Sequence, residues 1–324
     1  MSLAELVANL RQNPSLLQKC DIQSAANRLS AIAPNSDATI EIGDDCAAIP
    51  DGEGYLLLAA EGMLPQFVEA EPWFAGWSAV MVNVSDIYAM GGYPIALVDT
   101  LWGQSLESCD RLWEGMQAAA KAYQVPIVGG HTNCHSVYNA LSVAILGRAK
   151  RLITSFDAQP GDRLLLVSDF RGIPHPNYPF WDAATCADPM QLRDNLAILP
   201  MLAEAGLCRA GKDISNAGII GTLLMLLETS GCGAVVQLDQ IPHPPELALE
   251  QWLVSFPSYG FLLSVNPENV SAVKASFQAH DLICEVIGAV QAEPQLVLRS
   301  LEESCVFWDL SQQALTGFSQ VQPI

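Results

Sequence analysis

The spacing of apolar and polar residues predicts strands and helices that alternate along the chain. Alternation of apolar and polar positions predicts strands, and apolar positions three or four residues apart predict helices. In the first half the predicted strands cover 38–42, 55–60, 95–101, 126–129 and 140–147, and the predicted helices cover 3–10, 16–29, 73–90 and 106–123. The helix at 73–90 is apolar on nearly every side, which predicts that it is buried. Gly91, Gly92 and Pro94 mark its end.

The second half continues the alternation after a turn-rich connection at 156–162. Strands are predicted at 163–168, 234–238, 261–265, 283–290 and 296–299, helices at 191–205, 217–229, 245–254 and 267–280, and an irregular segment at 169–189. Strands and helices interleaved in both halves predict an α/β protein with two domains. We expect a helical N-terminal arm at 1–34, a first domain at 35–155 and a second domain at 156–324.

Composition and charge narrow the classes of function. The 324 residues include 35 acidic and 15 basic side chains, which gives a formal net charge of −20. A chain this acidic is unsuited to binding nucleic acid or an anionic membrane through general electrostatics. Half of the residues are hydrophobic and only 15% are charged, which indicates apolar surface covered in an oligomer.

Cysteine usage and the N-terminus predict a cytoplasmic protein. The nine cysteines include no CxxC pair and no regular framework, which favours a reducing compartment. The first residues lack the basic region and cleavage pattern of a secretory signal. The apolar stretch 73–90 contains Asn83, Ser85 and Asp86, which are costly in a bilayer, so we expect no membrane span.

Acidic residues stand at positions where chemistry is expected. Asp44 and Asp45 follow the predicted strand 38–42 and Gly43, and carboxylates at a strand end can hold Mg²⁺ and join it to phosphates. A β-turn is the alternative, because Asp and Gly are common turn formers. Asp86 lies in the buried helix, with Asn83 three residues before it on the same face. A buried carboxylate needs a cation or several donors, so a metal ligand, an ion pair and a capping role are all open.

Four further segments, at 58–63, 80–92, 128–132 and 213–219, accompany the acidic motif at 43–45 in a fixed order. The ordered set resembles the superfamily of aminoimidazole ribonucleotide (AIR) synthetase, with thiamine-monophosphate kinase, selenophosphate synthetase and formylglycinamidine ribonucleotide synthetase as relatives. The resemblance covers roughly 35–290 and is nearest to AIR synthase-related proteins of unassigned substrate. It implies an AIR-synthetase-like fold, in which the N-terminal domain forms a β-barrel with its copy in a homodimer and a C-terminal α/β domain packs against it. It also implies that ATP binds in the cleft between the domains.

The resemblance further implies which residues hold the metal and the nucleotide. The implied Mg²⁺ ligands are Asp44, Asp45, Glu61, Asp86, Asp213 and Asn216. The implied nucleotide contacts are Gly43, Asn83, Gly129, Gly130, His131, Thr132 and Ser215. Glu61 stands where relatives generally carry Asp, Asn216 replaces an acid and Ala217 replaces a glycine, so the metal site has less charge and an altered geometry. Helix capping is the alternative role for Ser215 and Asn216.

Two polar segments allow further alternatives. The segment 128–135 follows a predicted strand, and its glycines permit close approach of a phosphate. His131, Cys134 and His135 also suggest zinc, although no second Cys/His cluster completes such a site, and a plain polar turn is the third possibility. The loop 170–182 is rich in proline and aromatic residues. It is interpreted either as an ordered surface loop or as a substrate loop, with substrate contacts at Arg171, His175, Trp181 and Asp182.

These features predict a Mg²⁺-dependent, ATP-binding enzyme that transfers a phosphoryl group to a small substrate or activates it by phosphorylation. The chain has no Gly-x-x-x-x-Gly-Lys-Ser/Thr motif, which excludes a P-loop enzyme. The sequence identifies no general base. The alternative is a non-catalytic nucleotide-binding subunit of a larger assembly, which the replacements at Glu61, Asn216 and Ala217 would favour.

Overall fold

A computed structural model describes residues 2–29, 40–301 and 303–318. The chain divides into two compact units, of which unit 1 comprises Met1–Asp44, Ile153–Ala183 and Leu202–Ile324. Unit 2 comprises Asp45–Leu152 and Ala184–Met201. Each unit combines a sheet with helices, which confirms the predicted α/β class. The predicted domain boundaries, after residues 34 and 155, stay predictions.

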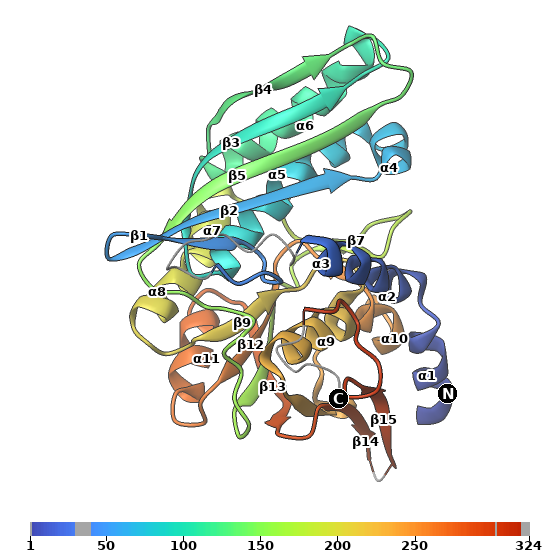
Figure 1. The fold of residues 1–324 in the computed structure, drawn as a ribbon, viewed down its shortest axis with the longest axis vertical. Helices are drawn as coiled ribbons and strands as arrows, with labels where there is room; N and C mark the ends of the chain where they lie inside the picture. The colour runs from blue at the N-terminus through green and yellow to red at the C-terminus, as the bar shows by residue number, and fades with distance from the viewer. Residues whose placement is uncertain (1, 30–39, 302, 319–324) are drawn as a thin grey trace. The chain divides into compact units, whose positions relative to one another are not determined.

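Unit 2 is built on one sheet with the strand order β1-β2-β5-β3-β4. Its elements are β1 (Ala47–Asp51), β2 (Gly54–Met63), α4 (Pro65–Ala70), α5 (Pro72–Ala89), β3 (Tyr93–Trp102), α6 (Leu106–Tyr123), β4 (Ile127–Asn133), β5 (Ala140–Ala149) and α7 (Pro189–Leu196). Helices α5 and α6 lie side by side behind this sheet (Figure 1). Their cover explains why Leu57, Leu97 and Ile145 are buried.

Two glycines allow α5 and α6 to pack closely. A Cβ at Gly76 would lie 2.2 Å from the carbonyl oxygen of Leu112, and a Cβ at Gly115 would lie 1.9 Å from that of Trp73. Any larger side chain at either position would push the two helices apart. The buried character that the sequence predicts for 73–90 therefore has a structural cause: one side of α5 contacts the sheet and another contacts α6.

The other face of the unit 2 sheet is not covered by any described element of this unit (Figure 1). Leu58 and Leu146 are direct cross-strand partners on this face, and they are 47% and 36% exposed. Val98 on the neighbouring strand is 44% exposed and pairs with Ala144. We call these four residues the open face; they form an apolar strip across three adjacent strands.

Unit 1 contains a seven-stranded sheet in the order β15-β14-β10-β13-β6-β12-β9 and a small sheet in the order β11-β8-β7. Its strands are β6 (Arg163–Ser168), β7 (Ile173–Pro174), β8 (Phe180–Asp182), β9 (Ala210–Asp213), β10 (Gly233–Gln237), β11 (Phe256–Pro257), β12 (Gly260–Val265), β13 (Ile283–Gln291), β14 (Gln295–Ser300) and β15 (Glu303–Asp309). Its helices are α1 (Leu3–Arg11), α2 (Pro14–Gln18), η1 (Lys19–Asp21), α3 (Ile22–Leu29), α9 (Gly218–Ser230), η2 (Leu238–Gln240), α10 (Leu249–Leu253) and α11 (Val270–Gln278). Helix α8 (Ile198–Glu204) spans the division between the units.

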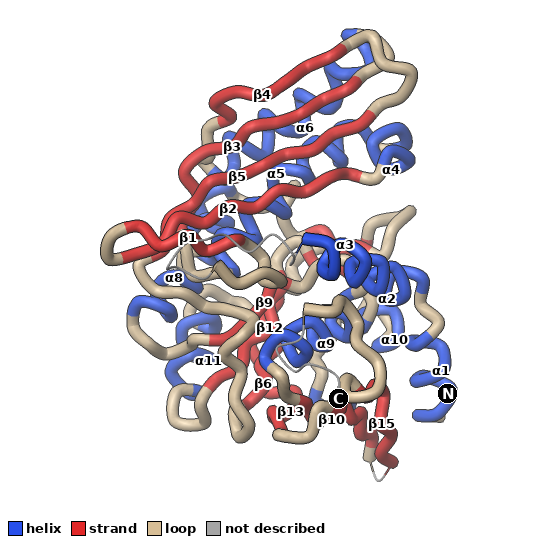
Figure 2. The backbone as a smooth tube through the Cα atoms, viewed as in Figure 1, coloured by secondary structure: helices blue, strands red, loops and turns tan. Residues whose placement is uncertain are grey.

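The strands β6 and β12 of the seven-stranded sheet are buried on both faces. Leu164, Leu166 and Leu262 belong to the core cluster that includes α9. The intervening residues Leu165 and Val167 of β6 are also fully buried. Helices α9 and α11 both pack against strands of this sheet (Figure 2). Near-continuous apolar strands are what such two-sided burial requires.

The N-terminal arm packs within unit 1. Ser2 and Glu5 form a capping box at the start of α1, which satisfies N–H groups that the helix leaves unpaired. Arg11, at the other end of α1, donates hydrogen bonds to the carbonyl oxygens of Val306 and Phe307 on β15 (2.8 Å each). The single helix predicted at 16–29 is wrong, because the segment is divided into α2, η1 and α3.

Several predicted boundaries are corrected by the structure. Residues 40–42 form no strand, while 38 and 39 lie outside the described residues; β1 instead begins after the acidic motif. Strand β4 extends to Asn133, so 129–132 lie in a strand and not in a turn. The predicted helix 191–205 is divided into α7 and α8. The short strands β7, β8 and β9, and the terminal strand β15, escaped prediction, because two to four residues show no periodicity and β15 is mostly polar or exposed.

Among the described residues, no helix has both the length and the apolar content needed to cross a membrane.

Candidate functional site

Asp45 and Asp86 approach each other within unit 2. A carboxylate oxygen of Asp45 lies within 4.8 Å of one of Asp86. Asp86 is buried in the last turn of the apolar helix α5, and Asp45 is half-buried just before β1. Two carboxylates at this separation repel each other unless a cation or a proton is shared between them. The pair therefore has the chemistry of a divalent-cation site.

Asn83 adds an oxygen to the same face of α5. Its side chain is fully buried, and its Nδ2 donates to the carbonyl oxygen of Ala79 (2.8 Å). Its Oδ1 atom is buried and has no hydrogen-bond partner among the described residues. A buried amide oxygen without a donor is costly, and a cation or a ligand donor would satisfy it. Asp45, Asp86 and Asn83 offer only oxygen ligands, which Mg²⁺ prefers.

Asp44, next in sequence to Asp45, is grouped with unit 1. Its Oδ2 accepts a hydrogen bond from the backbone N–H of Ser155 (2.8 Å). Gly43, before it, has φ of +118°, a conformation that side chains rarely permit. The glycine of the motif is therefore required by the backbone path, which turns sharply just before the two acids.

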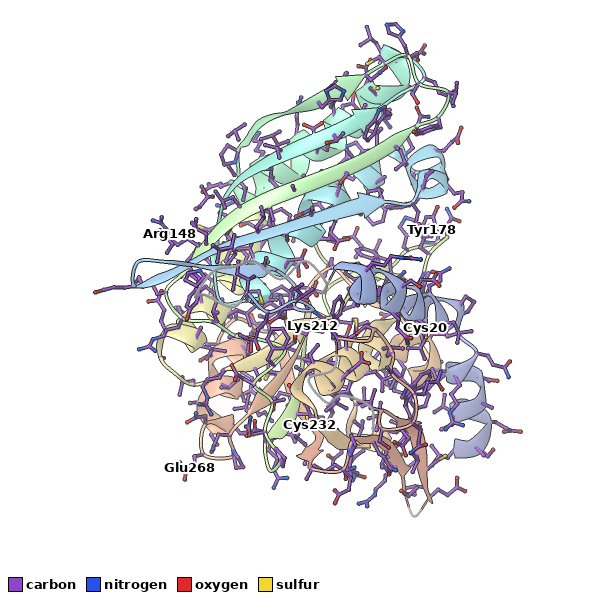
Figure 3. All side chains as sticks on the ribbon, viewed as in Figure 1. Cys20, Arg148, Tyr178, Lys212, Cys232 and Glu268 are labelled. Carbon is purple, nitrogen blue, oxygen red and sulfur yellow. The ribbon has the colours of Figure 1, made fainter. Side chains whose placement is uncertain are left out.

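Asp213 ends strand β9 in unit 1 and is buried, with Phe261 of β12 as its cross-strand partner. The residue before it, Lys212, is also buried (Figure 3). Buried lysines are rare and normally paired with an anion. Sequence reasoning did not select Lys212, although a lysine directly before the Asp213 motif was the available signal.

The turn after Asp213 leads into α9. The backbone N–H of Ser215 donates to Thr222 Oγ1 (3.3 Å), and the N–H of Gly218 donates to the carbonyl oxygen of Ser215 (2.9 Å). Ala217 is the N-cap residue, without a side-chain capping bond, and its φ is +81°. Helix capping of α9 by Ser215 or Asn216 is therefore wrong. The alanine occupies a left-handed conformation that favours glycine.

The segment predicted as a phosphate loop is an exposed part of strand β4. Gly129, Gly130, His131 and Thr132 are all exposed. Gly130 is required by its neighbour Asp99 on β3, because a Cβ would lie 2.4 Å from the Asp99 Oδ1. Within the described chain, no group of three potential metal ligands includes His131, Cys134 or His135, so nothing supports zinc.

Asp99 is a second residue that the sequence analysis did not select. Its Oδ2 atom is buried and has no hydrogen-bond partner in the described part of the chain. Burial raises the pKa of the Asp99 carboxyl above its usual value. The alternation of β3 points Asp99 to the same side as Leu97 and Leu101, so its position on the helix-covered face was readable from the pattern.

Glu61 lies inside strand β2, not at its end. Its side chain is exposed, and its carbonyl oxygen accepts a hydrogen bond from Ser142 Oγ on β5 (3.0 Å). The strand prediction 55–60 stopped one residue short of it.

The predicted substrate loop has a rigid base. Arg171 donates to both carboxylate oxygens of the buried Asp169, from Nε (2.8 Å) and Nη2 (2.7 Å). These hydrogen bonds raise the pKa of Arg171. Trp181 has no exposed surface; its indole N–H donates to the carbonyl oxygen of Asp169 (2.8 Å) and its ring packs edge-on against Trp252. The substrate contact predicted at Trp181 stays a prediction, and in the structure its ring is part of the core.

The outer part of the loop is more open. His175 lies with its ring 5.2 Å from that of Tyr178, and both side chains belong to the segment between β7 and β8. Asp182, at the end of β8, pairs with Ile173. The structure thus separates the four predicted substrate residues into a buried tryptophan and three residues that retain exposed surface.

Comparison with known proteins accounts for most of the chain. Residues 43–149 match the N-terminal domain of AIR synthase related proteins, and residues 159–300 match the C-terminal domain of that family. An uncharacterized protein of Synechocystis sp. is 58% identical over 318 residues, which cover 98% of this chain and 99% of that protein.

Two solved structures share the fold. PurL of Thermotoga maritima, complexed with ADP, has a TM-score of 0.73 and 20% identity over 97% of this chain, which spans 54% of that protein. AaThiL, complexed with AMPPCP and TMP, has a TM-score of 0.64 and 20% identity. The match covers 86% of this chain and 94% of AaThiL. The two-domain α/β architecture is therefore that of these proteins, and the chain belongs to the AIR synthase-related family.

Proposed function

We propose that this protein is a Mg²⁺-dependent ATP-binding enzyme that transfers a phosphoryl group to a small substrate or activates the substrate by phosphorylation. The observation that carries the proposal is the Asp45–Asp86 pair, together with the buried, unsatisfied side-chain oxygen of Asn83, three residues before Asp86 on α5. An oxygen-only set with two negative charges fits a hard divalent cation bound to phosphates. The solved relatives in complex with ADP and with AMPPCP add support for an adenine nucleotide.

In this proposal, Asp45 and Asp86 supply the principal metal ligands, and Asp213 is a ligand candidate carried over from the sequence. Asp44, Glu61 and Asn216 are the further candidates carried over from the sequence. Bound Mg²⁺ would neutralise phosphate oxygens and stabilise the charge that develops during phosphoryl transfer. Binding would also remove the repulsion between Asp45 and Asp86.

The residues proposed from the sequence as nucleotide contacts would form hydrogen bonds with the nucleotide. Asn83 would orient its free oxygen toward the metal or a ligand donor, and Ser215 lies in the turn that follows Asp213. Gly43, Gly129, Gly130, His131 and Thr132 complete the proposed set. Lys212 is added as a buried cation next to Asp213, because a lysine ammonium is a strong phosphate partner. Arg171, His175 and Asp182 stay as the proposed substrate residues.

The open face of unit 2 is proposed as the homodimer interface. Leu58, Leu146, Val98 and Ala144 form an apolar strip with no described element of unit 2 over it. A sheet face of this composition is normally packed against another surface. Pairing with a second copy would bury it and would join the two sheets, as the family resemblance implies.

The rival is a non-catalytic nucleotide-binding subunit, and Ala217 is the observation that favours it. Ala217 occupies a left-handed conformation, with φ of +81°, at the turn where the family resemblance expects glycine. Together with Asn216, this residue is what loss of a metal-dependent activity would leave at this loop. The two proposals differ in turnover and share ATP binding.

Thermal denaturation with ATP, Mg²⁺ or both tests the shared claim. At a hundredfold excess over Kd, Mg²⁺ and ATP together should stabilise the protein by about 2.7 kcal/mol relative to its apo form. This stabilisation should exceed that by Mg²⁺ or ATP alone. Asp86→Asn should lose most of that increment while its apo form is at least as stable, because a repulsive buried charge is removed. If the variant is destabilised and keeps its response to Mg²⁺ and ATP, Asp86 is a structural residue and the metal proposal fails.

ATP turnover separates the enzyme from the rival. Purified protein is incubated with Mg²⁺, ATP and candidate acceptors, beginning with thiamine monophosphate, and ADP is measured. Acceptor-dependent ADP release supports the enzyme, and the acceptor identifies the substrate class. Binding without turnover under every condition favours the non-catalytic subunit, and no ATP binding in the presence of Mg²⁺ contradicts both.

A further inference from the structure

Buried Glu228 holds the C-terminal end of the described chain. Glu228 lies in the last turn of α9 and is 2% exposed. Its two carboxylate oxygens accept hydrogen bonds from the backbone N–H groups of Leu315 (2.8 Å), Thr316 (2.8 Å) and Gly317 (3.3 Å), and from Thr316 Oγ1 (2.5 Å). Charge-assisted bonds of this kind are among the stronger ones in proteins. We call residues 314–318 the C-terminal strap.

A second residue fixes the strap from the N-terminal arm. Gln23 in α3 donates from Nε2 to the carbonyl oxygens of Ala314 (2.8 Å) and Leu315 (3.0 Å). Leu315 is fully buried in the core cluster around α9. The strap is therefore bonded on both its N–H and its carbonyl groups, and its path over α9 is well defined.

The strap ends on the glycine of the acidic motif. A Cβ on Gly43 would lie 2.8 Å from both Cβ and Cγ of Phe318, so the Phe318 side chain packs directly against the Gly43 backbone. Both residues belong to unit 1. The contact fills the space beside Gly43 and limits the conformations open to Gly43 and Asp44.

The other side of the motif is tied to the same turn of α9. The Ser155 N–H donates to Asp44 Oδ2 (2.8 Å), and the Ser155 carbonyl oxygen accepts from Thr229 Oγ1 (2.6 Å) and Ser230 Oγ (2.7 Å). Thr229 and Ser230 directly follow Glu228 in the sequence. Three consecutive residues of α9 thus hold Gly43 through the strap and Asp44 through Ser155.

We propose that the C-terminal strap and the last turn of α9 position the Gly43–Asp44–Asp45 segment for metal and nucleotide binding, with Phe318 as a positioning residue. The inference rests on the proposed function, because it assigns the strap to the proposed Mg²⁺ site. Phe318 need not touch the ligand, since it acts through the backbone of Gly43. A purely structural strap would contribute to stability without affecting the affinity for Mg²⁺ and ATP.

The test uses the full chain with Phe318→Ala, Phe318→Leu and Phe277→Leu. Phe277 is fully buried in α11 and has no part in the strap, so Phe277→Leu is the control for a general loss of packing. Isothermal titration of ATP in the presence of Mg²⁺ should give a Kd at least tenfold higher for Phe318→Ala than for the wild type. Phe318→Leu should recover most of the affinity, and Phe277→Leu should lower Tm with an unchanged Kd. An unchanged Kd for Phe318→Ala overturns the inference.

Glu228→Gln gives an independent variant of the same network. The amide keeps one acceptor oxygen but places an NH2 donor where the other oxygen accepts from the strap, so the strap should be loosened and the Kd should rise as for Phe318→Ala. Glu268→Gln, at an exposed position (Figure 3), is the matched control for removal of one negative charge and should bind normally. Equal Kd values for Glu228→Gln, Glu268→Gln and the wild type overturn the role of the α9 turn.

Amide hydrogen exchange separates failure of the inference from failure of the proposed function. Peptides covering residues 40–46 should exchange faster in Phe318→Ala than in the wild type and Phe277→Leu. This readout needs no ligand, so it applies even if the wild type does not bind ATP, which would contradict the proposed function alone. Unchanged exchange at 40–46 in Phe318→Ala contradicts the strap's positioning role.

Discussion

The two main sheets bury their side chains in different ways. In unit 1, successive residues of β6 and β12 are buried on both faces of the sheet. In unit 2, β2 and β5 alternate between buried residues under the helices and the exposed residues of the open face. The difference teaches that unit 1 completes its own core, while unit 2 presents an apolar surface that no described element of unit 2 covers. The proposed homodimer would cover this surface with a second copy.

The largest expected effect comes from truncation in the two-sided sheet. Phe261→Ala in β12 removes a fully buried ring and should lower the free energy of unfolding by about 3–5 kcal/mol. Leu58→Ala on the open face should cost less than about 1 kcal/mol in the monomer, because that side chain is already half exposed. Urea denaturation of both variants at a concentration where the protein is monomeric measures the contrast, and equal losses would contradict it.

A charge on the open face should instead act on assembly. Leu146→Lys places an ammonium opposite Leu58, and we expect the dimer to dissociate at least a hundredfold more readily, which is about 2.7 kcal/mol. Leu106→Lys, at an exposed leucine that begins α6, is the control and should assemble normally. Light scattering over a concentration series measures both. A wild type that stays monomeric at micromolar concentration refutes the proposed interface.

Asp99 allows a pH test of the helix-covered face of unit 2. Because burial raises the folded pKa of Asp99, the folded state binds this proton more tightly than the unfolded state. The contribution of Asp99 to the free energy of unfolding is therefore largest below pH 3.8, the ordinary pKa of an Asp carboxyl. This contribution is lost as the pH rises through the higher pKa of the folded state. Asp99→Asn should be more stable than the wild type at pH 7, with a difference that shrinks toward pH 4.

The control for this effect is Asp110→Asn, on an exposed position of α6. Its denaturation midpoint should follow that of the wild type at every pH. If Asp99→Asn also follows the wild type between pH 4 and 7, the carboxyl is not destabilised by burial and the contrast between the faces is weaker than the structure indicates.

The smallest expected effect is at the strained turn of unit 1. Ala217→Gly relieves a left-handed alanine, worth about 1 kcal/mol, but it removes a buried methyl and loosens the unfolded chain by similar amounts. The free energy of unfolding should change by less than about 0.5 kcal/mol. Ala122→Gly, in the regular helix α6, is the control and should cost about 1 kcal/mol. A loss at Ala217 as large as at Ala122 would show that the turn is unstrained.

The sequence predicted the long, strongly periodic elements most accurately. The helix at 106–123 and the strand at 163–168 match α6 and β6 residue for residue, because each has a clear apolar period and a defined cap or turn. The strand before the acidic motif was wrong at 40–42, since local alternation there is overridden by the turn at Gly43 and by contacts with the distant Phe318. Such contacts join residues more than 270 positions apart, so no local pattern carries them.

For the candidate site, the local sequence predicted which carboxylates could bind a metal, but it did not predict which residues lie near them or how deeply they are buried. The motif identified Asp45 and Asp86, but their approach within 4.8 Å depends on how the segment before β1 meets α5. Lys212 and Asp99 were missed, because their burial follows from neighbouring strands. The burial of Trp181 was not predicted, because composition alone does not distinguish an exposed loop aromatic from one packed against Trp252.

The most direct test of the proposed site is the crystal structure of the protein with Mn²⁺ and a non-hydrolysable ATP analogue, phased on the anomalous signal of manganese. We predict an ion that contacts the analogue's phosphates and is coordinated by Asp45 and Asp86 at about 2.1 Å. Crystals in which the analogue binds elsewhere, or in which no ion contacts Asp45 or Asp86, would contradict the proposed metal-dependent function.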